Sequence, residues 1–88
     1  MNIIRSGKYQ INLLVILQYI AKDKTSVSKN FQKKLDTLIK NIPNFPYKYK
    51  PSIYFNDLNI RDLIYKKYNI NYEVNLESNT IEILNIFK

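Results

Sequence analysis

The side chains that could perform or support chemistry in this 88-residue sequence are almost all lysine, arginine and tyrosine. There is no His, so the commonest general base at neutral pH and the commonest metal ligand are both missing. There is no Cys, which excludes thiolate metal sites and disulfides. The acidic residues are scattered singly, and a single Gly cannot build a Gly-rich phosphate loop. We therefore expect no cofactor and no metal site.

Cleavage of RNA is one reaction that these residue types still permit. A Lys, Arg, Tyr or Glu can activate a ribose 2′-hydroxyl, but several cations must also converge on the phosphate to stabilise its developing charge. The cations of the last third of the sequence are Arg61, Lys66, Lys67 and Lys88. Two of these four fall in one expected turn, so the sequence offers little support for strand cleavage.

The positive charge is concentrated in the first part of the sequence. The net charge is +7: residues 1–50 hold ten basic and two acidic side chains, and residues 51–88 hold four and five. Such an excess is typical of nucleic-acid-binding surfaces. An AT-rich genome would also enrich Lys, together with the Asn, Ile and Tyr that dominate this composition. Both interpretations stay open.

The segment 44–56 mixes prolines, aromatics and lysines. Lys48 and Lys50 alternate with tyrosines, an arrangement that can neutralise phosphates while rings stack on bases. The alternative is structural, with Phe45 and Phe55 pinning a long loop to the core. We expect pinning by the two Phe residues and leave the role of the Lys and Tyr residues open.

Three runs near the C-terminus predict an antiparallel meander. Ile60–Tyr65, Tyr68–Val74 and Thr80–Phe87 are rich in β-branched and aromatic residues and largely alternate apolar with polar residues. Only short polar breaks separate them, which indicates tight turns. A lone meander is marginal in water unless its apolar face is covered. Asn2–Arg5 is a further candidate, for an edge strand.

Two helices are predicted upstream of the meander. The first follows Ser6, a candidate N-cap, and ends at residues 22–24; the second is capped by Thr25 or Ser26 and ends before Pro43. Their expected core faces are Tyr9, Leu13, Ile16, Leu17 and Ile20 in the first helix, and Val27, Phe31, Leu35, Leu38 and Ile42 in the second.

Ile11 and Val15 lie on the opposite face of the first helix, where they are either incidental or part of a partner site.

The apolar stretch Ile11–Ala21 is well short of the ~20 residues that a membrane span needs. We therefore expect a cytoplasmic protein with one α+β domain over residues 1–88. Its expected order is an N-terminal strand, an antiparallel two-helix hairpin and a small, mainly antiparallel sheet (β-α-α-β-β-β).

The order and wording of these segments resemble the RelE/ParE superfamily, the toxins of bacterial type II toxin–antitoxin pairs. The resemblance covers essentially the whole sequence, although no single motif is specific. It is carried by the runs Ile16–Ala21, Phe31–Leu35, Ile60–Leu63, Tyr68–Val74 and Ile81–Ile86.

The two branches of that superfamily imply different activities. RelE-like members cut mRNA on the ribosome, whereas ParE-like members inhibit DNA gyrase and need no catalytic residues of their own. Where RelE carries catalytic Lys and Arg, this sequence has Ile60, Asp62 and Asn69, and it stops at Lys88 where ParE toxins usually continue with a basic tail. Arg61 matches the Arg of a ParE-like Arg-Glu-Leu stretch, so the ParE-like branch is favoured.

The resemblance also implies partners and sites. DNA gyrase is the expected target, with the ribosome and mRNA as the alternative and a non-toxic nucleic-acid-binding domain as a third reading. The residues expected to contact the target are Lys48, Lys50, Arg61, Lys66 and Lys67. A cognate antitoxin is expected to form a hetero-oligomer with the toxin through an amphipathic helix and an extended segment. Its expected contacts are Ile11, Val15, Ile83, Ile86 and Phe87.

Overall fold

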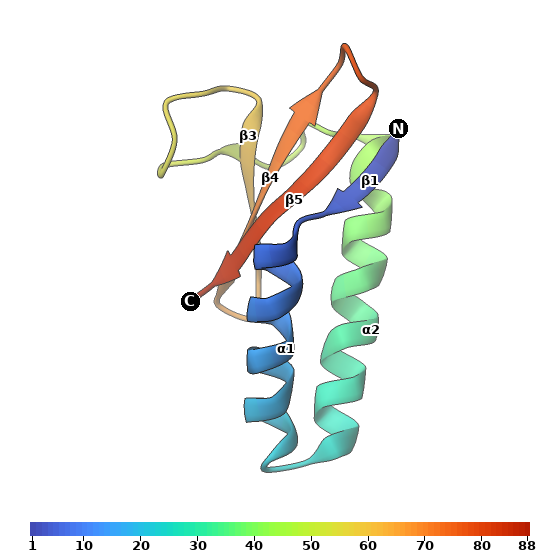
Figure 1. The fold of residues 1–88 in the computed structure, drawn as a ribbon, viewed down its shortest axis with the longest axis vertical. Coiled ribbons are helices and arrows are strands. Elements are labelled where there is room, and N and C mark those ends of the chain that lie inside the picture. The colour runs from blue at the N-terminus through green and yellow to red at the C-terminus, as the bar shows by residue number, and fades with distance from the viewer.

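The computed structural model describes residues 1–88 as two helices packed on a five-stranded sheet (Figure 1). This arrangement confirms the predicted α+β fold with its N-terminal strand and helical hairpin. Lys50–Pro51 is a further strand, which the sequence pattern did not predict. In chain order, the elements are β1 (Asn2–Arg5), α1 (Gly7–Ala21), α2 (Thr25–Asn41), a 3-10 turn (Ile42–Asn44), β2 (Lys50–Pro51), β3 (Ile60–Tyr65), β4 (Tyr68–Asn75) and β5 (Thr80–Phe87).

The sheet has the strand order β1-β5-β4-β3-β2. The strands β3, β4 and β5 form the predicted antiparallel meander, with Leu63 opposite Ile70 and Ile70 opposite Ile86. The edge strand β1 runs parallel to β5, in register from Asn2 opposite Thr80. Parallel neighbours need a long crossover, and the helical hairpin is part of the chain that separates these two strands.

Both meander turns contain residues with positive φ. Lys66 and Lys67 form the two-residue β3–β4 turn with φ values of 53° and 70°, and Asn79 has a φ of 57° in the β4–β5 turn. Positive φ at both central residues is what a type I′ hairpin turn requires, and it matches the twist of the strands.

Ser6 joins the start of α1 to the sheet. Its hydroxyl oxygen accepts a hydrogen bond from the Tyr9 N–H at 3.1 Å and its O–H donates to the Leu84 carbonyl at 2.8 Å. Its own backbone N–H donates to the Ile83 carbonyl. The predicted N-cap is therefore confirmed, and the same residue fixes α1 against β5.

The predicted cap of α2 is wrong. The helix begins at Thr25, and its N-cap is Lys24, which makes no side-chain capping hydrogen bond. Only residues 22–24 connect the two helices, so Lys24 takes the extended conformation (φ −145°) that reverses the chain. The hydroxyl residues of the segment then fall one position too late to cap.

A single apolar layer between the sheet and the hairpin forms the core. Val27 was expected in this layer but is 50 % exposed, because the connected end of the hairpin extends past the sheet along the long axis (Figure 1). Ile39, which was not expected, is fully buried. The buried cluster consists of Tyr9, Phe31, Leu35, Ile39, Ile42, Leu63, Ile70, Tyr72, Val74, Ile81, Ile83 and Ile86.

The loop between the helices and β3 is not pinned by its phenylalanines. Phe45 is 71 % exposed and Phe55 is 44 % exposed, so that expectation is wrong. The loop is instead tied down through its backbone and a tyrosine. The Tyr72 hydroxyl donates to the Pro46 carbonyl at 2.6 Å, and the Tyr49 ring packs edge-on against Tyr72 at 6.4 Å.

We expect the protein to lose stability in alkali because of two core tyrosines. Burial raises the pKa of Tyr9 to about 12 and also raises the pKa of Tyr72. The folded state therefore holds protons that the unfolded state releases near pH 10, so stability is complete below about pH 10 and falls as the pH rises further. For Tyr9 the loss is on the order of 2 kcal/mol. Urea unfolding between about pH 8 and pH 11.5 measures it.

The Tyr9→Phe variant is the matched comparison. It lacks the ionisable hydroxyl, so its stability should fall less steeply above about pH 10 than that of the natural chain. Identical slopes for the two chains would contradict the assignment to Tyr9.

Candidate partner-binding surfaces

One face of α1 carries a stripe of exposed apolar side chains. Ile11 is 65 % exposed and Val15 is 59 % exposed, as the sequence indicated, and the structure adds Leu14 at 57 % and Tyr19 at 69 %. The spacings i, i+3, i+4 and i+8 place these four residues on one side of the helix, a pattern visible in the sequence. We name them the α1 stripe. A contiguous apolar helix face of this kind is typical of an interaction site.

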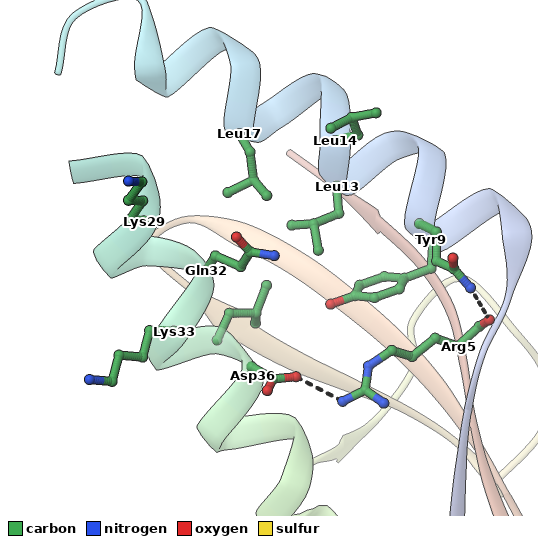
Figure 2. A pocket seen from close by; sticks show the side chains of 11 residues that line it. Arg5, Tyr9, Leu13, Leu14, Leu17, Lys29, Gln32, Lys33 and Asp36 are labelled. Carbon is green, nitrogen blue, oxygen red and sulfur yellow. Dashed lines mark hydrogen bonds and ion pairs between the residues drawn. The ribbon is translucent and has the colours of Figure 1, made fainter. Parts of the chain in front are cut away.

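A groove between α1 and α2 lies next to this stripe (Figure 2). It has a volume of about 540 Å³ and shares Leu14 with the stripe. Leu13 and Leu17 of α1 line one wall, and Lys29 and Gln32 of α2 line the other. The stripe and the groove therefore form one continuous surface with an apolar and a basic side.

An ion-paired cluster closes one end of the groove. Arg5 donates from Nη2 to the Asp36 carboxylate at 2.8 Å, and Lys40 approaches the other Asp36 oxygen at 3.0 Å. Burial alone would raise the pKa of Asp36, but the hydrogen bonds and charges of Lys40 and Arg5 outweigh it and hold this pKa below its usual value. The carboxylate thus stays ionised and is satisfied within the chain.

Tyr9 places a polar atom at the inner wall of the same groove. Its side chain is only 2 % exposed, and its ring lies between α1 and α2 with the hydroxyl turned towards the groove (Figure 2). No hydrogen bond to this hydroxyl is formed within the chain. The Tyr9 hydroxyl therefore offers an entering group a hydrogen-bonding partner beside the leucines of α1.

Arg61 has a structural role that the sequence did not indicate. Its Nε donates to the Leu58 carbonyl at 2.9 Å, and its Nη1 donates to the carbonyls of Tyr49 at 3.0 Å and Tyr47 at 3.4 Å. The guanidinium also lies over the Tyr47 ring, 4.9 Å from its centre. Arg61 thus ties the loop before β3 to the sheet. Arg61 was expected to contact the target; that role stays a prediction, and the structure shows that its guanidinium is already bound within the chain.

The remaining predicted cations form two separate groups. Lys48, whose Nζ lies 5.6 Å from the centre of the Tyr49 ring, and Lys50 of β2 lie beside the start of β3. Lys66, Lys67 and Lys88 lie at the other end of the meander, and Lys88 Nζ is 5.3 Å from the centre of the Tyr68 ring. We name these last three residues the basic tip. No single pocket brings the predicted cations together.

The predicted antitoxin contacts on β5 need revision. Ile83 and Ile86 are at most 1 % exposed, so their side chains are in the core and cannot contact a partner. The outward edge of β5 is covered by β1 as far as Ile83, and Asn12 of α1 donates to the Asn85 side chain at 2.6 Å. Phe87 is half-buried and its ring packs edge-on against Tyr54 at 5.1 Å. Ile11 and Val15 of α1 are therefore the most accessible residues of the predicted set, and Phe87 is accessible in part.

A comparison with known protein families shows which family the chain belongs to. A family model described as the ParE toxin of the type II toxin–antitoxin system parDE matches residues 3–88. The chain belongs to this family. It is therefore a toxin of the RelE/ParE superfamily, as the sequence resemblance indicated, and membership implies an antitoxin partner. No curated protein matches the chain in sequence. Neither helix of this family member is long and apolar enough to cross a membrane.

We expect Arg61→Ala to destabilise the protein by about 1–3 kcal/mol, because three backbone carbonyls lose a charged donor. The loop over residues 45–59 should also become more sensitive to limited proteolysis. Urea unfolding measures the first effect and mass mapping of the fragments measures the second. Lys50→Ala is the control, since this exposed neighbour makes no ion pair, and its effect should stay within about 0.5 kcal/mol. Equal stabilities of the two variants would refute the structural role of Arg61.

Proposed function

We propose that this toxin acts in the cytoplasm by binding DNA gyrase and inhibiting it, and that a cognate antitoxin neutralises it. The observation that carries the choice of target is the dispersal of the cations. RNA scission needs several cations around one phosphate. Arg61 is hydrogen-bonded to three carbonyls, and Lys66, Lys67 and Lys88 lie at the far end of β3 from it. This arrangement favours inhibition by binding over catalysis.

The surface that supports antitoxin binding is the α1 stripe together with the groove. An amphipathic helix laid along α1 would bury Ile11, Leu14, Val15 and Tyr19, which are more than half exposed in the free chain. The basic side of the groove, with Lys29 on α2, favours acidic residues along the polar edge of that helix. The Tyr9 hydroxyl adds a hydrogen-bonding partner at the inner wall of the groove.

A supercoiling assay tests the proposed target. Purified toxin added to gyrase, relaxed plasmid and ATP should inhibit supercoiling, and an equimolar amount of antitoxin should restore it. Primer extension on translated mRNA is the discriminating arm. Codon-dependent cleavage products with unaffected supercoiling would overturn the gyrase proposal in favour of a ribosome-dependent endonuclease.

We expect Val15→Asp to weaken antitoxin binding at least about tenfold, because it places a charge in the middle of the apolar α1 stripe. Val15 is 59 % exposed, so the fold should tolerate the change. Isothermal titration calorimetry measures the affinity, and circular dichroism checks the fold. Ile53→Asp is the matched control, since Ile53 is 85 % exposed but lies in the loop before β3. An affinity for Val15→Asp equal to that of the control would remove α1 from the interface.

A further inference from the structure

The β3–β4 turn holds two lysines in a backbone conformation that lysine disfavours. Lys66 and Lys67 have φ values of 53° and 70°, in the left-handed region that suits Gly and Asn. Two-residue turns of this kind favour Asn-Gly. The local sequence therefore opposes the local geometry, and such departures cluster at functional sites.

Base composition does not explain these lysines. Codons for Lys and Asn differ only in their third base, and the chain contains twelve Asn residues. The β4–β5 turn places one of them, Asn79, at its own positive-φ position. A bias towards AT-rich codons could thus have supplied Asn at the β3–β4 turn with less strain. Base composition alone therefore does not account for a pair of lysines at this turn.

The third lysine of the basic tip lies next to this turn. Lys88 follows Phe87, which pairs with Asn69, and its Nζ lies over the Tyr68 ring. The C-terminal end of β5 and the β3–β4 turn lie side by side in Figure 1. None of the three tip lysines forms an ion pair; the two ion pairs of the protein both involve Asp36. The tip therefore carries three ammonium groups that no acidic side chain pairs.

A rigid aromatic cluster supports these charges. Phe31 of α2 packs against Tyr65 at 5.1 Å and against Tyr68 at 5.6 Å, so the residues on both sides of the turn are fixed to the hairpin. Tyr65 also borders a hollow lined by Lys33 and Lys34 of α2. Two more basic side chains thus lie on the adjacent helix, and together with the tip they form an extended positive surface.

Three of the four acidic side chains of the meander lie towards its opposite end, and the fourth, Asp62, is buried on β3 and accepts a hydrogen bond from Asn71 at 2.6 Å. Glu73 and Glu82 are directly paired across β4 and β5, and Glu77 is in the turn that joins these strands. This turn is at the far end of the meander from the C-terminus (Figure 1). The basic tip is therefore the end of the meander that carries no acidic side chain.

We propose that the basic tip binds the phosphate backbone of nucleic acid without reading its sequence. The charged groups of the tip are all lysine, a residue that the cores of protein–protein interfaces deplete and that serves as a point charge for phosphate. The tyrosine rings beside the turn are already packed on Phe31, so the tip supplies electrostatic contacts and no base-stacking platform. The tip lysines lie outside the α1 stripe, and this activity does not depend on the identity of the toxin's target.

The test is a titration of labelled nucleic acid at several salt concentrations. Fluorescence anisotropy with a labelled duplex DNA, and with single-stranded DNA and RNA of the same length, gives the affinity from about 50 to about 300 mM KCl. The variant Lys66→Asn/Lys67→Gly removes two charges and installs the residues that the turn favours. Its melting temperature should be unchanged or higher. Its affinity at low salt should fall roughly five- to tenfold, and its salt slope should decrease by about 1 for each lysine.

Two control variants show whether the affinity for nucleic acid depends on where the lysines lie or only on the net charge of the protein. Lys48→Gln/Lys50→Gln removes the same net charge beside β2 and should change the affinity less than about twofold. Lys66→Arg/Lys67→Arg keeps the charge and the strain, and should bind like the natural chain.

The proposal is overturned if the natural chain binds none of the three probes at low salt, or if the Lys48/Lys50 variant loses as much affinity as the turn variant. It is also overturned if the turn variant loses affinity only for gyrase, which would assign the lysines to a protein interface. Antitoxin affinity, measured in parallel, should stay within about twofold in the turn variant. A failure of the gyrase assay leaves this result unaffected.

Discussion

A single apolar layer between one face of the sheet and the helical hairpin holds this molecule together. All of its largest buried side chains belong to that layer, and the other face of the sheet has no helix over it. A chain of 88 residues can build only one such layer. Because the hairpin is longer than the sheet that it covers, part of its apolar surface has no partner within the chain. The exposure of Val27 follows from this mismatch in length, whereas the α1 stripe is exposed because it lies on the side of α1 that faces away from the core.

Local sequence patterns predicted the helices and strands. What they did not predict depends mostly on contacts between residues far apart in the sequence. The alternation in the last third of the sequence predicted three strands because a half-buried strand must alternate. Ser6 was predicted as an N-cap because its hydroxyl satisfies an N–H three residues away. Val27 failed although its spacing was correct, since burial at that position depends on how far the sheet extends beneath α2. No periodicity in the helix encodes the length of a distant strand.

The loop before β3 is a second case in which the local sequence did not predict the tertiary contacts. Phe45 and Phe55 were expected to pin it because they are its most apolar residues, yet both are exposed. The loop is fixed instead by backbone carbonyls that accept hydrogen bonds from Tyr72 and Arg61. Carbonyl groups are the same in every sequence, so composition could not point to them. Arg61, which was expected to contact the target, thus supports the fold. The other predicted cations lie at the two ends of β3.

The proposed antitoxin surface and the hollow near the basic tip share one side chain. Lys33 of α2 lines both the groove beside α1 and the hollow that borders Tyr65 near the basic tip. An acidic partner seated in the groove would lower the positive potential around Lys33, and charge effects reach about 8 Å at physiological ionic strength. Occupation of the groove by such a partner and binding of an anion near Lys33 would therefore oppose each other electrostatically. Because such coupling is reciprocal, an anion held near Lys33 must weaken an acidic partner in the groove by the same factor.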